Sequence, residues 1–145
     1  MNLIIDTNIV FSTLLNPNSI IGDLLLNYQD SIHFFAPELL IEEIDRYSDK
    51  IEKYSKLNSS QIAICKSLLL NSIQFVSENL ISTESWTSAY NLTIDIDEND
   101  TPFVALAIEM NTKLWSGDKK LTSGLLSKKS EIIYTTQELK NLLSI

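Results

Sequence analysis

Five short apolar runs, each separated from the next by a segment of helical character, limit the folds open to this 145-residue chain. The runs are predicted to be strands at 2–5, 32–35, 73–76, 113–116 and 131–134. Strands that are connected through helices pair in parallel, and a parallel sheet is covered by helices on both faces. We therefore expect an α/β fold in one domain, residues 1–145: a three-layer α/β/α sandwich around a central, mostly parallel sheet of four to five strands.

The segments between these strands carry helix-start signals. Asn58 with Gln61 and Thr135 with Glu138 have the spacing of a capping box, and Ser82 has the position of a cap. The expected helices lie near 19–28, from Pro37 to about 55, from 59 to about 71, from 83 to about 92, near 99–111, near 119–127 and after Thr135.

Composition excludes several kinds of chemistry. The chain has one cysteine, one histidine and three isolated glycines, so a disulfide, a histidine-rich zinc site and a glycine-rich phosphate loop are not expected. His33 lies within a predicted strand, where a structural role is favoured, and Cys65 lies in an apolar helical context that predicts an inert core thiol. No run approaches the roughly 20 apolar residues of a membrane span, and no signal peptide is recognised, so we expect a cytoplasmic protein. Carboxylates remain for the chemistry.

Two aspartates directly follow predicted strands. Asp6 follows the strand at 2–5, and Asp118 follows the strand at 113–116. Each has the alternative role of a helix cap or turn residue. If these two strands are neighbours at a switch point of the sheet, both carboxylates emerge on the rim where open α/β sheets bind ligands. Thr7 and Asn8 are then placed to hydrogen-bond the Asp6 carboxylate, and Ser116 to serve as a hydroxyl ligand or water anchor.

Helix geometry separates Glu42 from Glu43. The predicted helix that begins at Pro37 has an apolar stripe of Leu40, Ile44, Tyr47, Ile51 and Tyr54. At 100° per residue, Glu43 lies about 60° from the centre of that stripe and Glu42 about 160° away. Glu42 is therefore expected in solvent, whereas Glu43 borders the core, either pointing inward or reaching out to water.

A third acidic group precedes the apolar segment 103–108. Acids are common at helix N-termini, and Pro102 suits a first helical turn, so we place the helix start near Glu98 or Asn99 instead of at Asp97. Asp100 then shares a face with Phe103 and is expected to point into the interior. A buried, charged acid without a basic partner requires a cation or a proton.

Together the four acids Asp6, Glu43, Asp100 and Asp118 form a set of oxygen donors. Such a set suits Mg²⁺ or Mn²⁺ and disfavours zinc or copper. One or two of these ions activate water and stabilise the leaving oxygen of a phosphodiester. Metal-assisted hydrolysis is therefore the chemistry that these residues support best.

At this point the sequence resembles the PIN-domain ribonucleases, over essentially its whole length. The resemblance rests on four blocks in the same order and spacing: Leu3-Ile4-Ile5-Asp6-Thr7-Asn8, Pro37 to Glu43-Ile44, Asp97-Glu98-Asn99-Asp100-Thr101-Pro102-Phe103-Val104-Ala105-Leu106-Ala107 and Leu114-Trp115-Ser116-Gly117-Asp118-Lys119-Lys120-Leu121. The last two blocks are most similar to a prokaryotic, toxin-like branch. Two positions depart from the pattern: Ser116 stands where Thr is commoner, and Asn99 where close relatives often have an acid.

The resemblance implies roles for particular residues. Asp6, Glu43, Asp100 and Asp118 would be the acidic metal-binding quartet, Asp97 an auxiliary acid, and Asn8 and Ser116 would orient ligands or water. Family members are typically Mg²⁺- or Mn²⁺-dependent ribonucleases, and many are dimeric toxins of type II toxin–antitoxin pairs. We therefore expect a metal-dependent endoribonuclease that cleaves single-stranded RNA, with an antitoxin protein and a second copy of the chain as partners.

The candidate residues for RNA binding are lysines. Lys119 and Lys120, with Lys128 and Lys129, are the basic residues proposed to contact phosphates, although any of them has the alternative of a solvated surface lysine. The net charge of −8 argues against broad phosphate binding.

The alternative to a ribonuclease is a catalytically idle PIN-like or receiver-like α/β module that acts through protein binding. The receiver version is disfavoured because Asp6 has no acidic neighbour.

Overall fold

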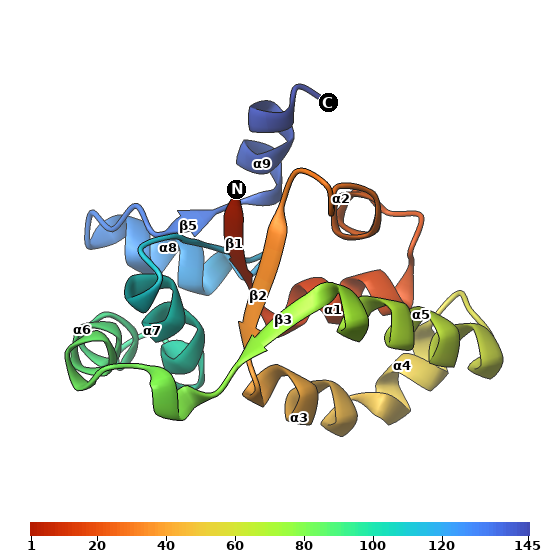
Figure 1. Ribbon diagram of the computed structural model, residues 1–145, viewed down its shortest axis with the longest axis horizontal. Coiled ribbons are helices and arrows are strands. Elements are labelled where there is room, and N and C mark those ends of the chain that lie inside the picture. Colours follow the sequence, from red (N-terminus) through yellow and green to blue (C-terminus); the bar gives the residue numbers. More distant parts are fainter.

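The computed structural model describes residues 1–145, and at its centre lies a five-stranded sheet in which every pairing is parallel (Figure 1). The strand order is β3-β2-β1-β4-β5. The strands are β1 (Asn2–Ile5), β2 (His33–Pro37), β3 (Ile73–Val76), β4 (Lys113–Trp115) and β5 (Ile133–Tyr134). All five predicted strands are confirmed, with small shifts at their ends.

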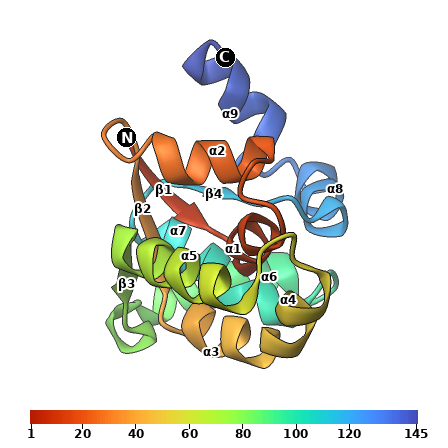
Figure 2. The same cartoon turned by 90° about the vertical axis from the view of Figure 1, so that its right-hand side faces the viewer.

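Helices cover the sheet on both faces, as the three-layer prediction requires. Helices α1 to α5 lie on one side of the strands and α6 to α8 on the other, while α9 projects beyond the end of the sheet (Figures 1 and 2). The helices are α1 (Thr7–Leu15), α2 (Ile20–Asn27), α3 (Leu39–Arg46), α4 (Ser48–Tyr54), α5 (Ser59–Ser72), α6 (Thr83–Thr93), α7 (Thr101–Glu109), α8 (Lys119–Ser127) and α9 (Thr136–Leu143), with 3-10 turns η1 (Glu78–Leu80) and η2 (Glu98–Asp100). No single helix is long and apolar enough to cross a membrane; α1 and α2 reach that length and hydropathy only as a pair bent by 108°.

The core is one cluster of 31 buried apolar residues. The β1 residues Leu3, Ile4 and Ile5 have no exposed surface, because helices pack on both faces of this central strand. Helix α7 contacts β1, β2 and β4, and its residues from Phe103 to Ala107 are all buried. Cys65 is also buried in this cluster, and burial raises the pKa of its thiol.

The register of the sheet brings two distant segments together. β1 and β4 are neighbours, with Ile5 opposite Trp115, so the next residues along both strands leave the sheet side by side. The chain builds one half of the sheet outward from β1 and the other half from β4, which makes this pair the switch point. The condition on which the placement of Asp6 and Asp118 depended, that the first and fourth strands are neighbours, is therefore met. His33 is exposed and pairs with Asn2 at the opposite end of the strands.

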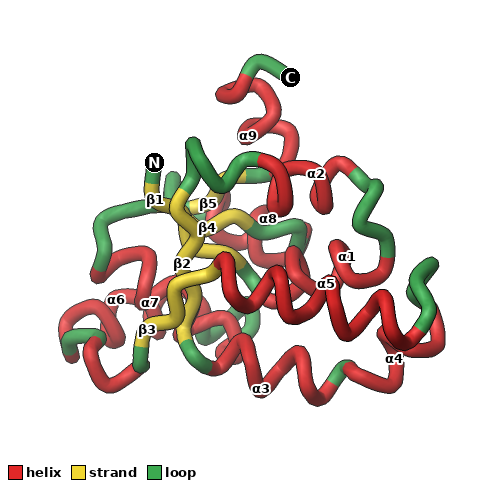
Figure 3. The backbone as a smooth tube through the Cα atoms, turned by 45° about the vertical axis from the view of Figure 1, so that its right-hand side comes forward, coloured by secondary structure: helices red, strands yellow, loops and turns green.

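Helix α1 was not predicted. Its buried residues Ile9, Val10 and Leu14 have helical spacing, but Thr, Asn, Ile and Val at its start are weak helix formers. The helix forms because packing against α2, α3 and α5 overrides this local preference. In the tube view, α1 lies on the same side of the strands as α4 and α5 (Figure 3).

The predicted single helix from Pro37 to about residue 55 is wrong. Pro37 ends β2, and the helical segment divides into α3 and α4 at Tyr47, which has a non-helical ψ of 6°. The second part turns to pack against α1 and α5. The apolar stripe is therefore broken, and Tyr47 and Tyr54 are 38% and 62% exposed.

The start of α7 also differs from the prediction. Asp97 caps the 3-10 turn η2, because its carboxylate accepts a hydrogen bond from the Asn99 backbone amide at 3.0 Å. The α-helix begins only at Thr101, and Pro102 occupies its second position, where no helical hydrogen bond is lost. The capping box of Asn58 with Gln61 is confirmed with both of its hydrogen bonds.

Candidate functional site

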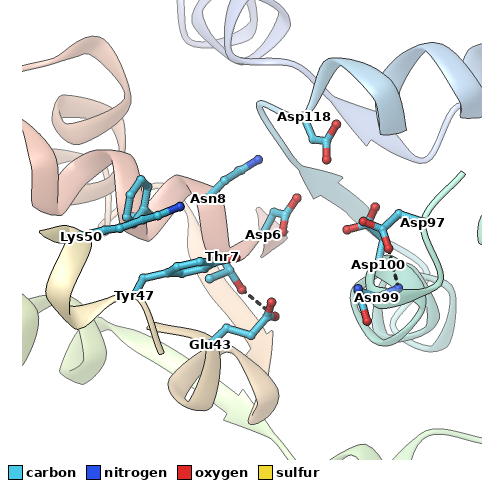
Figure 4. A pocket seen from close by; sticks show the side chains of 11 residues that line it. Asp6, Thr7, Asn8, Glu43, Tyr47, Lys50, Asp97, Asn99, Asp100 and Asp118 are labelled. Carbon is cyan, nitrogen blue, oxygen red and sulfur yellow. Dashed lines mark hydrogen bonds between the residues drawn. The ribbon is translucent and has the colours of Figure 1, made fainter. Parts of the chain in front are cut away.

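A pocket of about 330 Å³ opens at the carboxyl end of the sheet, next to the switch point (Figure 4). All five predicted acids line it, and they come from four separate parts of the chain. The lining residues are Asp6, Thr7, Asn8, Phe11, Glu43, Tyr47, Lys50, Asp97, Asn99, Asp100 and Asp118. Ser116 lies immediately behind them, buried against Asp6.

Asp6 occupies the position before α1, yet its side chain makes no capping hydrogen bond. Its Oδ2 instead accepts a hydrogen bond from the Ser116 hydroxyl at 2.7 Å, because the register brings both residues out of the sheet together. Burial raises the pKa of Asp6 to about 6; hydrogen bonds from Ser116 and the Thr7 backbone oppose this, and the charges of Asp118 and Glu43 add to it. The simple capping role is therefore absent at Asp6.

Asp100 has the most unusual surroundings of the set. It stands before α7 without a capping hydrogen bond and is 9% exposed. Its Oδ2 is the one fully buried side-chain oxygen or nitrogen in the chain that has no hydrogen-bond partner. Burial raises its pKa to about 7, and the charges of four other acids contribute in the order Asp6, Asp97, Asp118 and Glu43. A buried carboxylate oxygen without a partner is a costly feature that a cation relieves.

Asp118 combines both roles considered for it. One oxygen, Oδ1, accepts a hydrogen bond from the Leu121 backbone amide at 3.1 Å and so caps α8, while the side chain lines the pocket. The Ser116 hydroxyl that donates to Asp6 also accepts from the Asp118 backbone amide at 3.0 Å. One serine thus links the two strand ends, and it fixes the relative position of the two aspartates.

Glu43 and Glu42 are separated as predicted. Glu43 is half-buried and lines the pocket, whereas the Glu42 side chain is 70% exposed and lies 3.8 Å from Arg46. The pKa of Glu43 is raised by burial, with the Thr7 hydrogen bond and the Arg46 charge opposing. The Thr7 hydroxyl donates to Glu43 Oε1 at 3.0 Å, so the expectation that the Thr7 side chain holds Asp6 is corrected: it reaches across to α3 (Figure 4).

Three helices begin at this pocket. The N-termini of α1, α7 and α8 follow Asp6, Asp100 and Asp118 directly. The positive end of a helix dipole favours a nearby anion, which partly offsets the mutual repulsion of the acids. Asn8 adds a polar group to the wall. Its side chain does not hydrogen-bond Asp6 as expected, but accepts a long hydrogen bond of 3.5 Å from the Gly117 backbone amide. The three helix N-termini therefore lower the cost of gathering several carboxylates in this pocket.

One wall of the pocket was missed from the sequence. Phe11 and Tyr47 pack with their rings tilted by 60° at a centroid distance of 5.4 Å, and Lys50 extends over Tyr47 with its Nζ 5.7 Å from the ring centroid. Figure 4 shows the Lys50 ammonium directed into the pocket. This wall exists because the helix breaks at Tyr47. The signal was present as Ser48 and Asp49, a helix-start composition inside the predicted helix.

The lysines predicted to contact RNA phosphates lie outside the pocket. Lys119 and Lys120 are exposed on the first turn of α8, beside Asp118, but neither lines the acidic wall. Lys128 is bound to the Asp95 carboxylate and to the Leu92 carbonyl oxygen. Contact of Lys119 and Lys120 with RNA stays a prediction, and Lys50 is the one basic residue among the pocket residues.

The donors fit a hard divalent cation in chemistry. Five carboxylates, two side-chain amides and a threonine hydroxyl line the pocket, and histidine and cysteine do not. The unpartnered Asp100 oxygen is the feature that a cation would satisfy. No three of the acidic, histidine or cysteine side chains already converge on one point as a preformed metal site. Binding would therefore require the acid side chains to rotate inward.

Fold and site thus define a parallel α/β protein with an acidic pocket at its switch point. Comparison of the chain with known proteins agrees with this description. The sequence pattern of the PIN domain family matches residues 4–141, so the chain belongs to this family, whose members are nucleases. It is 30% identical over 126 residues to the uncharacterized protein MJ1680 of Methanocaldococcus jannaschii, covering 85% of this chain and 74% of that one.

A solved structure shares the fold. It is VapBC2 from Rickettsia felis bound to a DNA fragment from their promoter, with a TM-score of 0.64, 15% identity, and coverage of 93% of this chain and 98% of that one. The receiver-like alternative is excluded by the sheet, because receivers have the strand order 2-1-3-4-5 and this chain has 3-2-1-4-5.

Proposed function

We propose that this chain is a metal-dependent endoribonuclease that cleaves single-stranded RNA. The observation that carries the proposal is the unpartnered, buried Asp100 oxygen in a pocket lined by four further carboxylates. Asp6, Glu43, Asp100 and Asp118, with Asp97 as an auxiliary acid, would hold Mg²⁺ or Mn²⁺. Membership of a nuclease family supports the class of reaction, and the oxygen donor set supports the choice of ion.

The proposed mechanism relies on carboxylates that are held in place before substrate arrives. When bound, a divalent cation supplies an activated water and neutralises charge on the phosphodiester. Ser116 fixes the Asp6 carboxylate and the backbone of Asp118, and Thr7 fixes Glu43. Asn8 would orient a water or a phosphate oxygen at the pocket wall. These contacts hold Asp6, Glu43 and the Asp118 backbone at the pocket, and the rotation of the acids that a cation requires would be completed on metal binding, before RNA arrives.

The test of this function is a cleavage assay on the purified protein. Single-stranded RNA is incubated with Mn²⁺, with Mg²⁺ or with EDTA, beside single-stranded DNA and double-stranded RNA of the same sequence. We expect cleavage of the single-stranded RNA only when a divalent ion is present. Cleavage that persists in EDTA would overturn the metal mechanism. No cleavage together with no metal-induced rise in melting temperature would favour the idle module.

Lys50 is proposed to bind a phosphate of the RNA. Its ammonium points into the pocket and has no ion pair there, so it is available to the substrate. Lys119 and Lys120 would make further phosphate contacts at the edge beside Asp118. With a net charge of −8, these few cations provide a local attraction that rising salt weakens.

Replacing Lys50 by Ala is expected to raise KM for RNA by roughly 3- to 10-fold, with a smaller change in kcat, because one charge-assisted phosphate contact is lost. The matched control is Lys53→Ala on the same helix, since Lys53 lies over Tyr54 and does not line the pocket. Steady-state kinetics at two salt concentrations measures both variants. Equal effects of the two substitutions would contradict a specific role for Lys50.

The proposed biological role is that of a cytoplasmic toxin, with the whole chain, residues 1–145, acting as one PIN-like domain inhibited by an antitoxin protein. Its support is the shared fold with the VapBC2 structure, a toxin–antitoxin assembly by its name. A short neighbouring gene whose product co-purifies with this chain and suppresses RNA cleavage is the expected finding. Cleavage that this product leaves unchanged would contradict the antitoxin assignment.

A homodimer is proposed through the outer face of α5. Ile64 and Leu68 lie one helical turn apart and are 63% and 60% exposed, which makes an apolar strip on the surface. Light scattering on the pure chain is expected to give twice the 16.4 kDa of one chain, and Ile64→Glu is expected to return it to 16.4 kDa. A wild-type mass of 16.4 kDa at micromolar concentration would contradict the dimer.

A further inference from the structure

A second hollow lies beside the acidic pocket, between α6 and the start of α7. Its volume is about 530 Å³, and its character is aromatic and polar, without any acid of the proposed metal set. The lining residues are Trp86, Thr87, Tyr90, Glu98, Asn99, Thr101 and Pro102. Neither the proposed chemistry nor the proposed phosphate contacts use this hollow.

Asn99 connects the two cavities, because it lines both of them. It stands between Glu98, which faces the second hollow, and Asp100, which lies in the acidic pocket. An extended strand with one phosphate at the acids therefore has the second hollow within reach of its neighbouring nucleotide. The hollow therefore corresponds to the nucleotide next to the phosphate at the acids.

The chemistry of the hollow suits a nucleobase. Trp86 and Tyr90 lie four residues apart on α6 and so face the same side, where they present aromatic surface. Trp86 is half-buried and packs against the core, which holds its ring in place, whereas Tyr90 is 47% exposed. Thr87, Glu98 and Asn99 add hydrogen-bonding groups at the rim. No lysine or arginine lines this hollow, so its chemistry does not suit a phosphate.

The charge of the chain favours such a contact. With 19 acidic and 11 basic residues, the surface as a whole repels a polyanion, and the acidic pocket has one lysine. Base stacking on an aromatic side chain supplies affinity that does not depend on net charge and tolerates any base. We propose that the hollow formed by Trp86, Tyr90 and Asn99 binds a nucleobase of the RNA next to the phosphate held at the acids. This inference rests on the proposed ribonuclease function.

The chain provides its own reporter for this contact. It has two tryptophans, and Trp115 is fully buried with its indole N–H donating to Thr136. Quenching of tryptophan fluorescence by a bound base therefore reports on Trp86. The protein used is Asp6→Asn with Mn²⁺ present, so that RNA is bound but not consumed. The ligands are an octauridylate and an abasic ribose-phosphate of the same length.

The expected result is quenching and tight binding with the octauridylate, and weaker binding without quenching for the abasic chain. Trp86→Ala is expected to weaken octauridylate binding about tenfold, whereas Trp86→Phe, which retains an aromatic ring, is expected to bind within about twofold of the wild-type residue. Because both variants lack the Trp86 reporter, their affinities are measured by the fluorescence anisotropy of an end-labelled octauridylate. Tyr54→Ala serves as the control, because Tyr54 is exposed but lines neither cavity. Melting temperatures verify that each variant is folded.

Equal affinity for the abasic chain, or an unchanged affinity in Trp86→Ala, would overturn the base site. Binding is measured in an inactive variant, so the two proposals fail separately. Base-dependent quenching in a protein whose wild type cleaves no RNA would remove the ribonuclease function and leave the base site. Cleavage by the wild type without base-dependent binding would remove the base site and leave the ribonuclease function.

Discussion

Replacing Asp6 by Asn is expected to reduce the rate of RNA cleavage by roughly 10²- to 10³-fold without unfolding the protein. The substitution removes a negative charge from the centre of the acidic pocket but keeps the shape of the side chain. Asn also retains an oxygen that accepts the hydrogen bond from Ser116, so the junction of β1 and β4 is preserved. Initial cleavage rates in Mn²⁺, with circular dichroism of both proteins, measure the effect.

Two adjacent glutamates provide the matched control. Glu43→Gln removes a carboxylate that lines the pocket, whereas Glu42→Gln removes one that is 70% exposed on the preceding residue of the same helix. We expect the first to reduce cleavage at least tenfold and the second to leave it within about twofold. A similar loss in both, or activity retained in Asp6→Asn, would show that cleavage does not depend on this pocket.

Asp100→Asn is expected to stabilise the metal-free protein, by on the order of 5 °C in melting temperature near neutral pH. The reason is the buried oxygen without a partner and the pKa of about 7, against an ordinary value of 3.8. An acid whose pKa is raised by folding binds its proton more tightly in the folded state. Its contribution favours folding at low pH and is lost as pH rises through the folded pKa.

The metal-free wild type should therefore lose stability as pH rises from about 4 to about 7, since the pKa of Asp6 is also raised, to about 6. Asp100→Asn should reduce this dependence, because it removes the contribution of Asp100 and leaves that of Asp6. Thermal unfolding in EDTA across this range measures it, with Glu98→Gln, an exposed acid two residues away, as the control. A destabilised Asp100→Asn, or a wild type that gains stability through this interval, would contradict the account.

Both predictions follow from a site that costs the fold stability until a cation binds. Asp6 and Asp100 occupy helix N-terminal positions where an aspartate ordinarily caps the helix, yet neither does so. Their carboxylates are directed into the pocket instead. A ligand that binds only the folded state restores stability in proportion to its concentration over Kd. Carboxylates whose pKa values are raised by burial and by neighbouring acids are concentrated at functional sites.

Much of the architecture was predictable because its signals are local. Each strand is a short apolar run, and the order of strands and helices implies a parallel sheet. The position of Asp6 and Asp118 at adjacent strand ends followed from the neighbour relation of the two strands, and the register confirms that relation. Helix periodicity alone separated Glu43 from Glu42.

What escaped prediction depends on contacts between segments distant in sequence. Helix α1 forms against its local propensity, and the break at Tyr47 lets α4 pack against α1 and α5. That break brings Tyr47 and Lys50 to the pocket, where periodicity had placed them on one continuous helix. The partner of the Thr7 hydroxyl, Glu43 on α3, likewise depends on how two helices pack. Local patterns do not contain this information.

The central claim is that these acids hold a divalent cation, and calorimetric titration with Mn²⁺ tests it most directly. At about pH 6.5, raised pKa values leave Asp6 and Asp100 partly protonated, so binding must release protons. Repeating the titration in two buffers of different ionisation enthalpy counts these protons. We predict that the wild type binds Mn²⁺ and releases protons on binding, and that the Asp6→Asn, Asp100→Asn double variant does not bind Mn²⁺. Equal binding by both proteins, or no binding by the wild type, would contradict the claim.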